Sequence, residues 1–344
     1  ASAGLGDHAV TKACAGFLTS NVRPDGSWPI DTNLATWVST LSVNALSLDG
    51  RLDRAAATEI ADWLIDQQHN EVHPYTHAAP GGWAWSPLSG AVPDGDDTSG
   101  AMIALGNLAP DDPKVIAAAA AGAKWLVDLQ NRDGGIPTFC RGWGKLPFDH
   151  SCPDITAHAL GAWGVWRKSF DRVLAGKVQR ASERAIKYLA DQQRDDGSWR
   201  PLWFGNESAV DQANPTYGTA RVLYGLSLAS VEIPDDMTRR GVDWLLGAQN
   251  DDGGWGGDIS LASSIEETAL AVDALLCAGD ITPEVEAGSE WLVEHTGDGQ
   301  AFPPAAIGLY FAKLWYYEEL YPRIFTVSAL NRLLAKRSAI RENQ

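Results

Sequence analysis

Apolar and polar residues alternate along the chain in blocks of helical length, and the blocks recur about every 50 residues. Five apolar stretches rich in small residues predict buried helices, at residues 41–46, 99–105, 155–163, 218–226 and 267–276. Between them lie partly charged stretches that end in an aromatic–Leu pair and predict helices with one exposed face. Strand signals are nearly absent, so the pattern predicts an all-α chain of helix pairs.

A turn motif closes most of the charged stretches. It combines Gln or Asn, a Gly-rich turn and usually a Trp, as in Y-L-A-D-Q-Q-R-D-D-G-S-W, which ends at Trp199. The other copies end at Trp28, Trp83, Ile136, Trp255 and Phe302. Asp and Gly favour a helix stop and a tight turn. We expect the Gln to hydrogen-bond the exposed amides of a neighbouring helix start, and the Trp to stack over it without any chemical role.

Repetition at this period indicates a repeated supersecondary unit with room for two helices. Small residues on the apolar helices let them pack closely around an axis. Six helix pairs that close on themselves give an (α/α)6 barrel, and closure buries the faces that an open array would leave exposed. We expect one such barrel domain over residues 1–344.

Three carboxylates crowd into four residues at Asp94-Gly95-Asp96-Asp97, just before the apolar stretch at 99–105. Carboxylates this close cannot all ionise at low cost, so at least one should hold its proton at neutral pH or find a counter-charge. A shared proton in an apolar setting is a strong Brønsted acid. The residues alone also fit a Ca²⁺ or Mg²⁺ site, or a helix N-cap.

Composition narrows the function classes. The 344 residues are 45% hydrophobic and 21% charged, which allows a large core. A net charge of −17 argues against nucleic acid and against a polybasic membrane patch. The 15 Trp suit both a structural repeat and the lining of an apolar cavity. Four Cys without a CxxC pair give neither zinc spacing nor a disulfide framework, which favours a reducing, cytoplasmic setting.

With these residues in view, the chain resembles the class II terpene cyclases, the squalene–hopene and oxidosqualene cyclase superfamily. Its turns are similar to the family's QW motif, and P-D-G-D-D-T is similar to its D-x-D-D acid motif. The resemblance covers nearly the whole chain but only one of the family's two barrels. By length and architecture, the chain is most like the single-domain members that make meroterpenoids.

The resemblance implies an isomerase that protonates the terminal alkene of a linear polyprenyl substrate, such as a prenylated aromatic acid. A carbocation cascade would then close the rings of a polycyclic meroterpenoid. The alternative is a cyclase that keeps the diphosphate of a prenyl diphosphate and makes a drimane- or labdane-type product. No cofactor or metal is implied, and Mg²⁺ would enter only with a diphosphate substrate.

The resemblance also implies roles for the acid motif and its neighbours. Asp96 would be the proton donor, while Asp94 and Asp97 would orient it and balance its charge. His158, in P-D-I-T-A-H-A-L, would hydrogen-bond Asp96, with Asp154 beside it. A plain core histidine is the competing interpretation of His158.

Aromatic positions that match the family's substrate-binding wall are Trp37, Trp85, Phe139, Tyr217, Phe302 and Tyr310. Cation–π attraction would stabilise each carbocation there by roughly 2 kcal/mol or more, whereas Lys, Arg or His facing the cavity would oppose it. For Trp37, Trp85 and Phe139, core packing is an equal interpretation. The sequence departs from the family at Ala305 or Ala306, where a second Phe is expected, and lacks a Trp just before Tyr217. Both changes argue against an all-hydrocarbon substrate of steroid length.

Two functions of other classes stay open on the sequence. A lectin-like toroid predicts solvent-exposed Trp residues and no buried acid. A β-subunit of a protein prenyltransferase needs an Asp–Cys–His zinc set and a partner subunit. The cyclase interpretation instead implies a hydrophobic small-molecule substrate, no obligate protein partner, and a cytoplasmic enzyme with transient membrane contact. No D-D-x-x-D run, P-loop, HExxH or G-x-S-x-G elbow is present.

Overall fold

The computed structural model describes residues 3–28, 33–49, 52–139, 147–308 and 315–342. The chain is mostly helical in these ranges, as its pattern predicted. The strands found there are β1 (Ile136–Pro137) and β2 (Ser151–Cys152), which pair antiparallel. Contacts divide the chain into two compact units, Ala1–Leu34 and Ala35–Gln344. One domain over residues 1–344 therefore stays a prediction.

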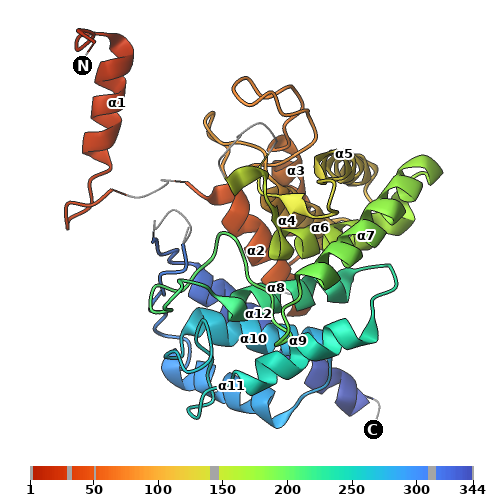
Figure 1. The fold of residues 1–344 in the computed structure, drawn as a ribbon. Helices are drawn as coiled ribbons and strands as arrows, with labels where there is room; N and C mark the ends of the chain where they lie inside the picture. The colour runs from red at the N-terminus through yellow and green to blue at the C-terminus, as the bar shows by residue number, and fades with distance from the viewer. Residues whose placement is uncertain (1–2, 29–32, 50–51, 140–146, 309–314, 343–344) are drawn as a thin grey trace. The chain divides into compact units, whose positions relative to one another are not determined.

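The first unit contains α1 (Ala9–Ser20), drawn in red in Figure 1, and a turn that ends at Trp28. The His8 ring caps the helix by accepting the N–H of Val10 at 3.3 Å. The Trp28 indole N–H donates to the carbonyl of Leu18 at 2.7 Å and ties the turn to the end of α1.

The second unit is a succession of helices joined by turns and loops (Figure 1). The helices are α2 (Ala35–Leu46), α3 (Arg54–Asp66), α4 (Gly95–Leu108), α5 (Pro113–Leu129), α6 (Pro153–Trp166), α7 (Arg172–Gln192), α8 (Pro215–Leu228), α9 (Asp235–Gly247), α10 (Ile265–Ala278), α11 (Pro283–His295) and α12 (Tyr321–Glu342). Single helical turns lie at Ser47–Asp49, Pro147–Asp149 and Arg167–Ser169. Among the described residues, no helix combines the length and hydropathy needed to cross a lipid bilayer.

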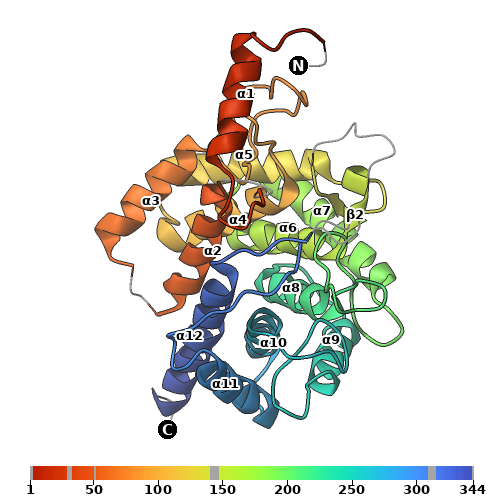
Figure 2. The same cartoon turned by 90° about the vertical axis from the view of Figure 1, so that its left-hand side faces the viewer.

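The even-numbered helices of this unit contact one another in a closed series. Each packs against the next along the chain, from α2 through α4, α6, α8 and α10 to α12, and α12 packs against α2. The odd-numbered helices pack against the outside of this series; α9, for example, contacts α8 and α10. In Figure 2, α8 and α10 are seen nearly end-on, with α9 and α11 outside them. We call α2, α4, α6, α8, α10 and α12 the inner helices, and α3, α5, α7, α9 and α11 the outer helices.

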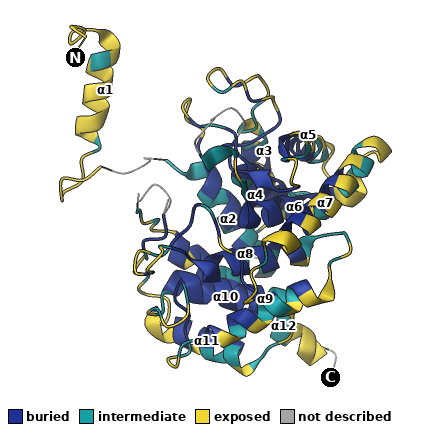
Figure 3. Ribbon diagram, viewed as in Figure 1, coloured by how far each residue is buried: buried dark blue, intermediate teal, exposed yellow. Residues whose placement is uncertain are grey.

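Burial follows this division (Figure 3). Every residue of α10 from Ile265 to Leu276 is buried, whereas α7 keeps an exposed stripe along its length. The inner helices approach closely because small residues lie between them. A Cβ on Gly225 of α8 would overlap the carbonyl of Ala157 in α6, and a Cβ on Gly164 of α6 would overlap the carbonyl of Leu228 in α8. Glycine at these sites therefore sets the spacing of two inner helices.

The Trp residues of the turn motif act as structural staples. In the second unit, the indole N–H of each turn-motif Trp donates to a leucine carbonyl in the preceding outer helix, and the ring is fully buried, whereas the Trp28 ring of the first unit is exposed. The pairs are Trp83 with Leu64 at 2.7 Å, Trp199 with Leu189 at 2.8 Å, and Trp255 with Leu245 at 2.7 Å.

The Gln of the turn motif bonds to carbonyls, so the prediction that it would bind backbone amides was wrong. The Gln193 side-chain N–H₂ donates to the carbonyl of Gly197 in its own turn at 2.9 Å and to that of Met237 in α9 at 3.0 Å. An amide N–H₂ carries two donors, and here one group satisfies two carbonyls. Gln68, Gln130 and Gln249 make the same pair of bonds. The Gln thus joins its turn to the next outer helix.

Candidate active site

The acid motif forms the start of inner helix α4. Asp94 is the N-cap, and its Oδ1 accepts the backbone N–H groups of Asp96 at 2.9 Å and Asp97 at 2.7 Å. The backbone of Asp94 also bridges Trp83 on one side and Phe139 on the other. The N-cap interpretation is therefore correct for Asp94. Hydrogen bonds to backbone groups hold the acid motif at the start of α4.

Asp96 points away from the cap and meets His158 on the neighbouring inner helix α6. The His158 Nδ1 lies 2.5 Å from Asp96 Oδ1. The His158 side chain is 3% exposed and the Asp96 side chain is 19% exposed, so Asp96 is the more accessible member of the pair. Burial lowers the pKa of His158, although the charge of Asp96 works in the opposite direction. The imidazole is therefore mainly neutral near pH 7.

Burial raises the pKa of the other two carboxyls of the motif. Burial raises the pKa of Asp94 to about 7, even though the backbone N–H groups it caps lower it. Burial, followed by the charge of Asp94, raises the pKa of Asp97 well above its usual value. One Asp97 oxygen is buried without a hydrogen-bond partner. Asp97 therefore favours its neutral form, which limits the negative charge beside Asp96.

Asp154 lies one helix away and belongs to the same electrostatic group. It accepts the thiol proton of Cys152 at 2.6 Å, and burial raises its pKa to about 6, with the charge of Asp96 adding to the effect. The Cys152 sulfur in turn accepts the N–H of Leu202 at 3.2 Å. Cys152 is therefore a structural thiol that orders Asp154 and the loop before α8. Cys140 lies outside the described residues.

Aromatic rings lie beside His158 and beside the backbone of the acid motif. The Trp37 ring packs edge-on against His158 with centroids 6.4 Å apart, and its indole N–H donates to the Tyr321 hydroxyl at 2.6 Å. Trp85 and Phe139 pack edge-on at 6.2 Å, beside the backbone of the acid motif. The structure therefore groups three of the six predicted wall positions with the acid motif or its histidine.

The structure does not group the other three predicted wall positions with the acid motif in the same way. Tyr217 lies on α8 and stacks on Phe204 at 4.2 Å, and its pKa responds to the charge of Asp96, which places it within electrostatic range. The Phe302 ring has the Arg323 guanidinium 5.6 Å from its centroid, so a cation already lies against it. Tyr310 lies outside the described residues.

Several residues of this region were missed by the sequence interpretation. Phe148 and Trp203 extend the aromatic cluster: they stack at 5.0 Å, and both contact Phe139 edge-on. They lie in segments between the long helices that carry no repeat signal. Arg221 on α8 is another residue that the sequence interpretation missed. Burial would lower its pKa, but Tyr217 and Asp96 raise it, which shows that a cation lies within range of the acid motif.

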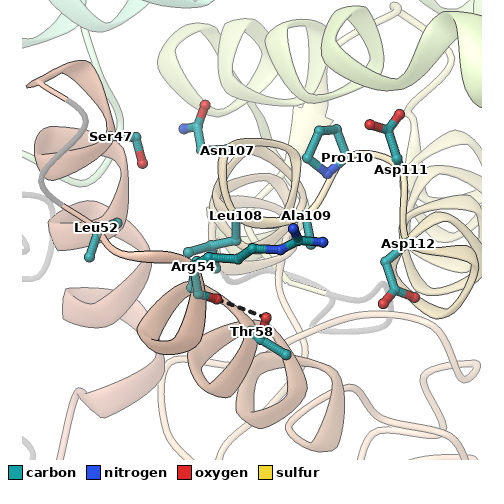
Figure 4. A pocket seen from close by; sticks show the side chains of 11 residues that line it. Ser47, Leu52, Arg54, Thr58, Asn107, Leu108, Ala109, Pro110, Asp111 and Asp112 are labelled. Atoms are coloured by element: carbon teal, nitrogen blue, oxygen red, sulfur yellow. Dashed lines mark hydrogen bonds between the residues drawn. The ribbon is translucent and has the colours of Figure 1, made fainter.

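A surface pocket lies at the far end of the inner helices (Figure 4). It has a volume of about 580 Å³ and is lined by residues at the C-terminal ends of α2 and α4 and the start of α3, among them Ser47, Arg54 and Asn107. Asn107 is eleven residues after Asp96 on α4, which corresponds to about 16 Å of helix. This pocket is therefore separate from the acid motif. No three His, Cys, Asp or Glu side chains in the described parts of the chain are grouped so that they could hold a metal ion.

Known proteins match this chain over most of its length. The sequence profile named "Squalene-hopene cyclase C-terminal domain" matches residues 35–335. A squalene–hopene cyclase from Bradyrhizobium diazoefficiens is 31% identical over 75% of this chain and 42% of its own length. The chain thus spans less than half of that relative.

Two solved structures share the fold. An ent-copalyl diphosphate synthase from Streptomyces platensis aligns with a TM-score of 0.67 and 21% identity, over 92% of this chain and 54% of its own. A variant of the type II terpene cyclase MstE from Scytonema, in complex with geranylgeranyl dihydroxybenzoate, aligns with a TM-score of 0.62 and 16% identity, over 95% of this chain and 96% of its own.

Proposed function

We propose that this chain, which belongs to the squalene–hopene cyclase C-terminal domain family, is a class II terpene cyclase that uses Asp96 to protonate an alkene. The observation that carries the proposal is the 2.5 Å contact between Asp96 and the buried, mainly neutral His158 at the start of α4. Asp96 also has the accessible carboxyl of its motif, whereas Asp94 and Asp97 are buried.

The surroundings of Asp96 fit the transfer of a proton to carbon. When the carboxyl gives up its proton, the carboxylate left behind lies at a helix N-terminus, where the backbone dipole favours negative charge. The His158 Nδ1 holds one carboxyl oxygen, so the other can face the substrate. Because Asp97 favours its protonated form, it adds little repulsion to the new carboxylate.

The architecture proposed for this chemistry is a single (α/α)6 barrel. The closed series of contacts among the inner helices supports it, as does the recurrence of the Trp and Gln bonds from one turn to the next. Burial of Trp83, Trp199 and Trp255 and of several acids runs against the lectin-like alternative, which requires exposed rings and no buried acid; among these turn residues only Trp28 is exposed.

The substrate proposed is a polyprenyl chain on an aromatic acid head group, which would yield a polycyclic meroterpenoid. The similarity to MstE supports this class, because that structure is titled as a complex with geranylgeranyl dihydroxybenzoate and matches this chain over nearly the full length of both. The second candidate is a prenyl diphosphate that keeps its diphosphate, supported by the similarity to ent-copalyl diphosphate synthase. No cofactor is proposed, and Mg²⁺ would serve only a diphosphate.

The test is Asp96→Asn with geranylgeranyl dihydroxybenzoate and geranylgeranyl diphosphate as substrates, read by mass spectrometry. Loss of the acid should reduce cyclisation by at least about 10²–10⁴-fold, while the melting temperature stays close to that of the wild type. Asp128→Asn is the matched control, because Asp128 is an exposed residue of α5 that pairs with Lys124. In D₂O, the wild-type product should gain deuterium at the protonated carbon. Wild-type turnover by Asp96→Asn, or a product without deuterium, would refute the proposal.

A further inference from the structure

The inner helices share a register that a threonine defines. In four of them a threonine hydroxyl near the helix start accepts the backbone N–H of the last residue of the preceding turn motif. The pairs are Thr98 with Trp83 at 3.0 Å, Thr156 with Ile136 at 2.8 Å, Thr219 with Trp199 at 3.0 Å, and Thr268 with Trp255 at 2.9 Å. Residues counted back from these threonines therefore occupy equivalent places in the fold.

Glu266 occupies the place of the proposed acid. The residue two before the threonine is Asp96 in α4 and Glu266 in α10. The residue one before it is Asp97 in α4 and Glu267 in α10, so both carboxyls of the acid motif have a counterpart. The same place holds Asp154 in α6 and Tyr217 in α8, and both respond electrostatically to Asp96. We infer that Glu266 lies on the face of α10 that corresponds to the acid-bearing face of α4.

The two helices lie opposite each other in the closed series of inner helices. Going one way, α6 and α8 separate α4 from α10; going the other way, α2 and α12 do. Adjacent helix starts are also linked, since Asn214 at the start of α8 donates to Glu267 at 3.0 Å. Glu266 therefore lies at the same level as Asp96, across the interior of the series.

The bonding of Glu266 leaves one oxygen unused. The side chain is 1% exposed, and its Oε1 accepts the N–H of Ala305 at 2.7 Å. Its Oε2 is buried without a hydrogen-bond partner. Glu267 contrasts with it, because Asn206, Asn214 and Ser264 all donate to its carboxyl. A buried carboxyl oxygen without a hydrogen-bond partner lowers the stability of the fold, and such a group is therefore a candidate for function. Of Glu266 and Glu267, only Glu266 has this property.

We propose that Glu266 is the base that ends the cyclisation, an inference that rests on the proposed function. In the last step, a C–H bond next to the cationic carbon breaks, and its electron pair forms a C=C bond. The proton passes to Oε2 of Glu266 and later to solvent, while Asp96 regains a proton from solvent. The substrate is isomerised without net gain or loss of protons.

The protonation behaviour of Glu266 suits this task. Burial, opposed by the Ala305 N–H and supported by the charge of Glu267, raises its pKa to about 7. A group of this kind is partly ionised at neutral pH, so it can accept a proton and release it again.

The test compares Glu266→Gln with Glu267→Gln on geranylgeranyl dihydroxybenzoate and geranylgeranyl diphosphate. Glu266→Gln keeps the acceptor for Ala305 but removes the base, so formation of the wild-type alkene should fall by about 10²-fold or more. Products quenched by water, or alkenes that lose a different proton, should take its place. Glu267→Gln keeps an amide oxygen for its asparagine partners and should retain the wild-type product ratio.

A second variant protects the test against loss of folding. Glu266→Met removes the buried charge and fills similar space, and it should show the same change of product as Glu266→Gln. If either folded variant makes the wild-type alkene at the wild-type rate, Glu266 is not the base. If that happens while Asp96→Asn is inactive, only this inference fails. If Asp96→Asn also turns over normally, the proposed function itself fails.

Discussion

Replacement of His158 by Phe tests the positioning of the acid most directly. The change removes the 2.5 Å contact to Asp96 but keeps a ring of similar size, so the packing against Trp37 is largely preserved. A hydrogen bond that involves a charged group contributes about 1.5–3 kcal/mol. If the contact acts in the transition state, kcat should fall by about 10- to 150-fold. Asp96 is 19% exposed, so water can solvate it in the variant and the loss of stability should be small.

His158→Asn identifies the atom that matters. The asparagine amide nitrogen can take roughly the place of Nδ1 and donate to Asp96, while the rest of the ring is lost. If Nδ1–H donates to Asp96 in the active enzyme, the asparagine variant should recover part of the activity that the phenylalanine variant loses. If Nδ1 instead accepts the acid proton, the amide can turn so that its oxygen accepts it, so partial recovery tests for a hydrogen-bonding atom at the Nδ1 position in either case. Equal loss in both variants would show that the asparagine amide does not replace this contact.

The assay is the steady-state rate of cyclisation under saturating substrate, together with the melting temperature of each variant. The double variant with Asp96→Asn should be no slower than Asp96→Asn alone, because His158 is argued to act through Asp96. A kcat within twofold of the wild type for a folded His158→Phe would refute the positioning role. Equal additive losses in the double variant would show that the two residues act separately.

Two further predictions concern stability. Gly225→Ala should lower the free energy of unfolding by about 1–3 kcal/mol in chemical denaturation, because its Cβ would overlap α6; Gly247→Ala in α9 has open space and should be neutral or slightly stabilising. The pKa of Glu266 rises from 4.5 to about 7 on folding, so wild-type stability is lost as pH rises through this window. Relative to Glu266→Gln, the wild type should lose up to about 3 kcal/mol between pH 4.5 and 7.5 in denaturant titrations at each pH; a constant difference would contradict this.

The sequence allowed prediction of the parts that depend on local spacing. The carboxylate cluster and the turn Trp residues could be identified from their spacing relative to the apolar stretches, whereas the pairing of His158 with Asp96 was implied only by the family resemblance. The Gln partners were mispredicted because a side-chain amide can donate or accept, and only the neighbouring helix decides which. Trp203 and Phe148 could not be found, since segments between the long helices bring them to Phe139 without any periodic signal.

The equivalence of Glu266 and Asp96 could not be predicted from the sequence, for a different reason. Glu266 lies one residue before the apolar stretch at 267–276, and nothing in the sequence there marks it as equivalent to Asp96. The equivalence depends on the threonine bonds to the preceding turns, which only coordinates reveal. The separation between the turn residue and the threonine also varies, from 13 residues at Trp255 to 15 at Trp83 and 20 at Trp199, so spacing alone does not reveal the register.

The three aspartates of the motif are separated by their surroundings into three tasks. One oxygen of Asp94 accepts two backbone N–H groups, so this residue fixes the start of α4. Asp97 is buried and favours its neutral form, which limits the negative charge next to Asp96. Had both neighbours been ionised, loss of a proton from Asp96 would create a third adjacent charge at high cost. The cluster therefore suits a single proton transfer from Asp96 because its other two members are, respectively, engaged by the backbone and kept protonated.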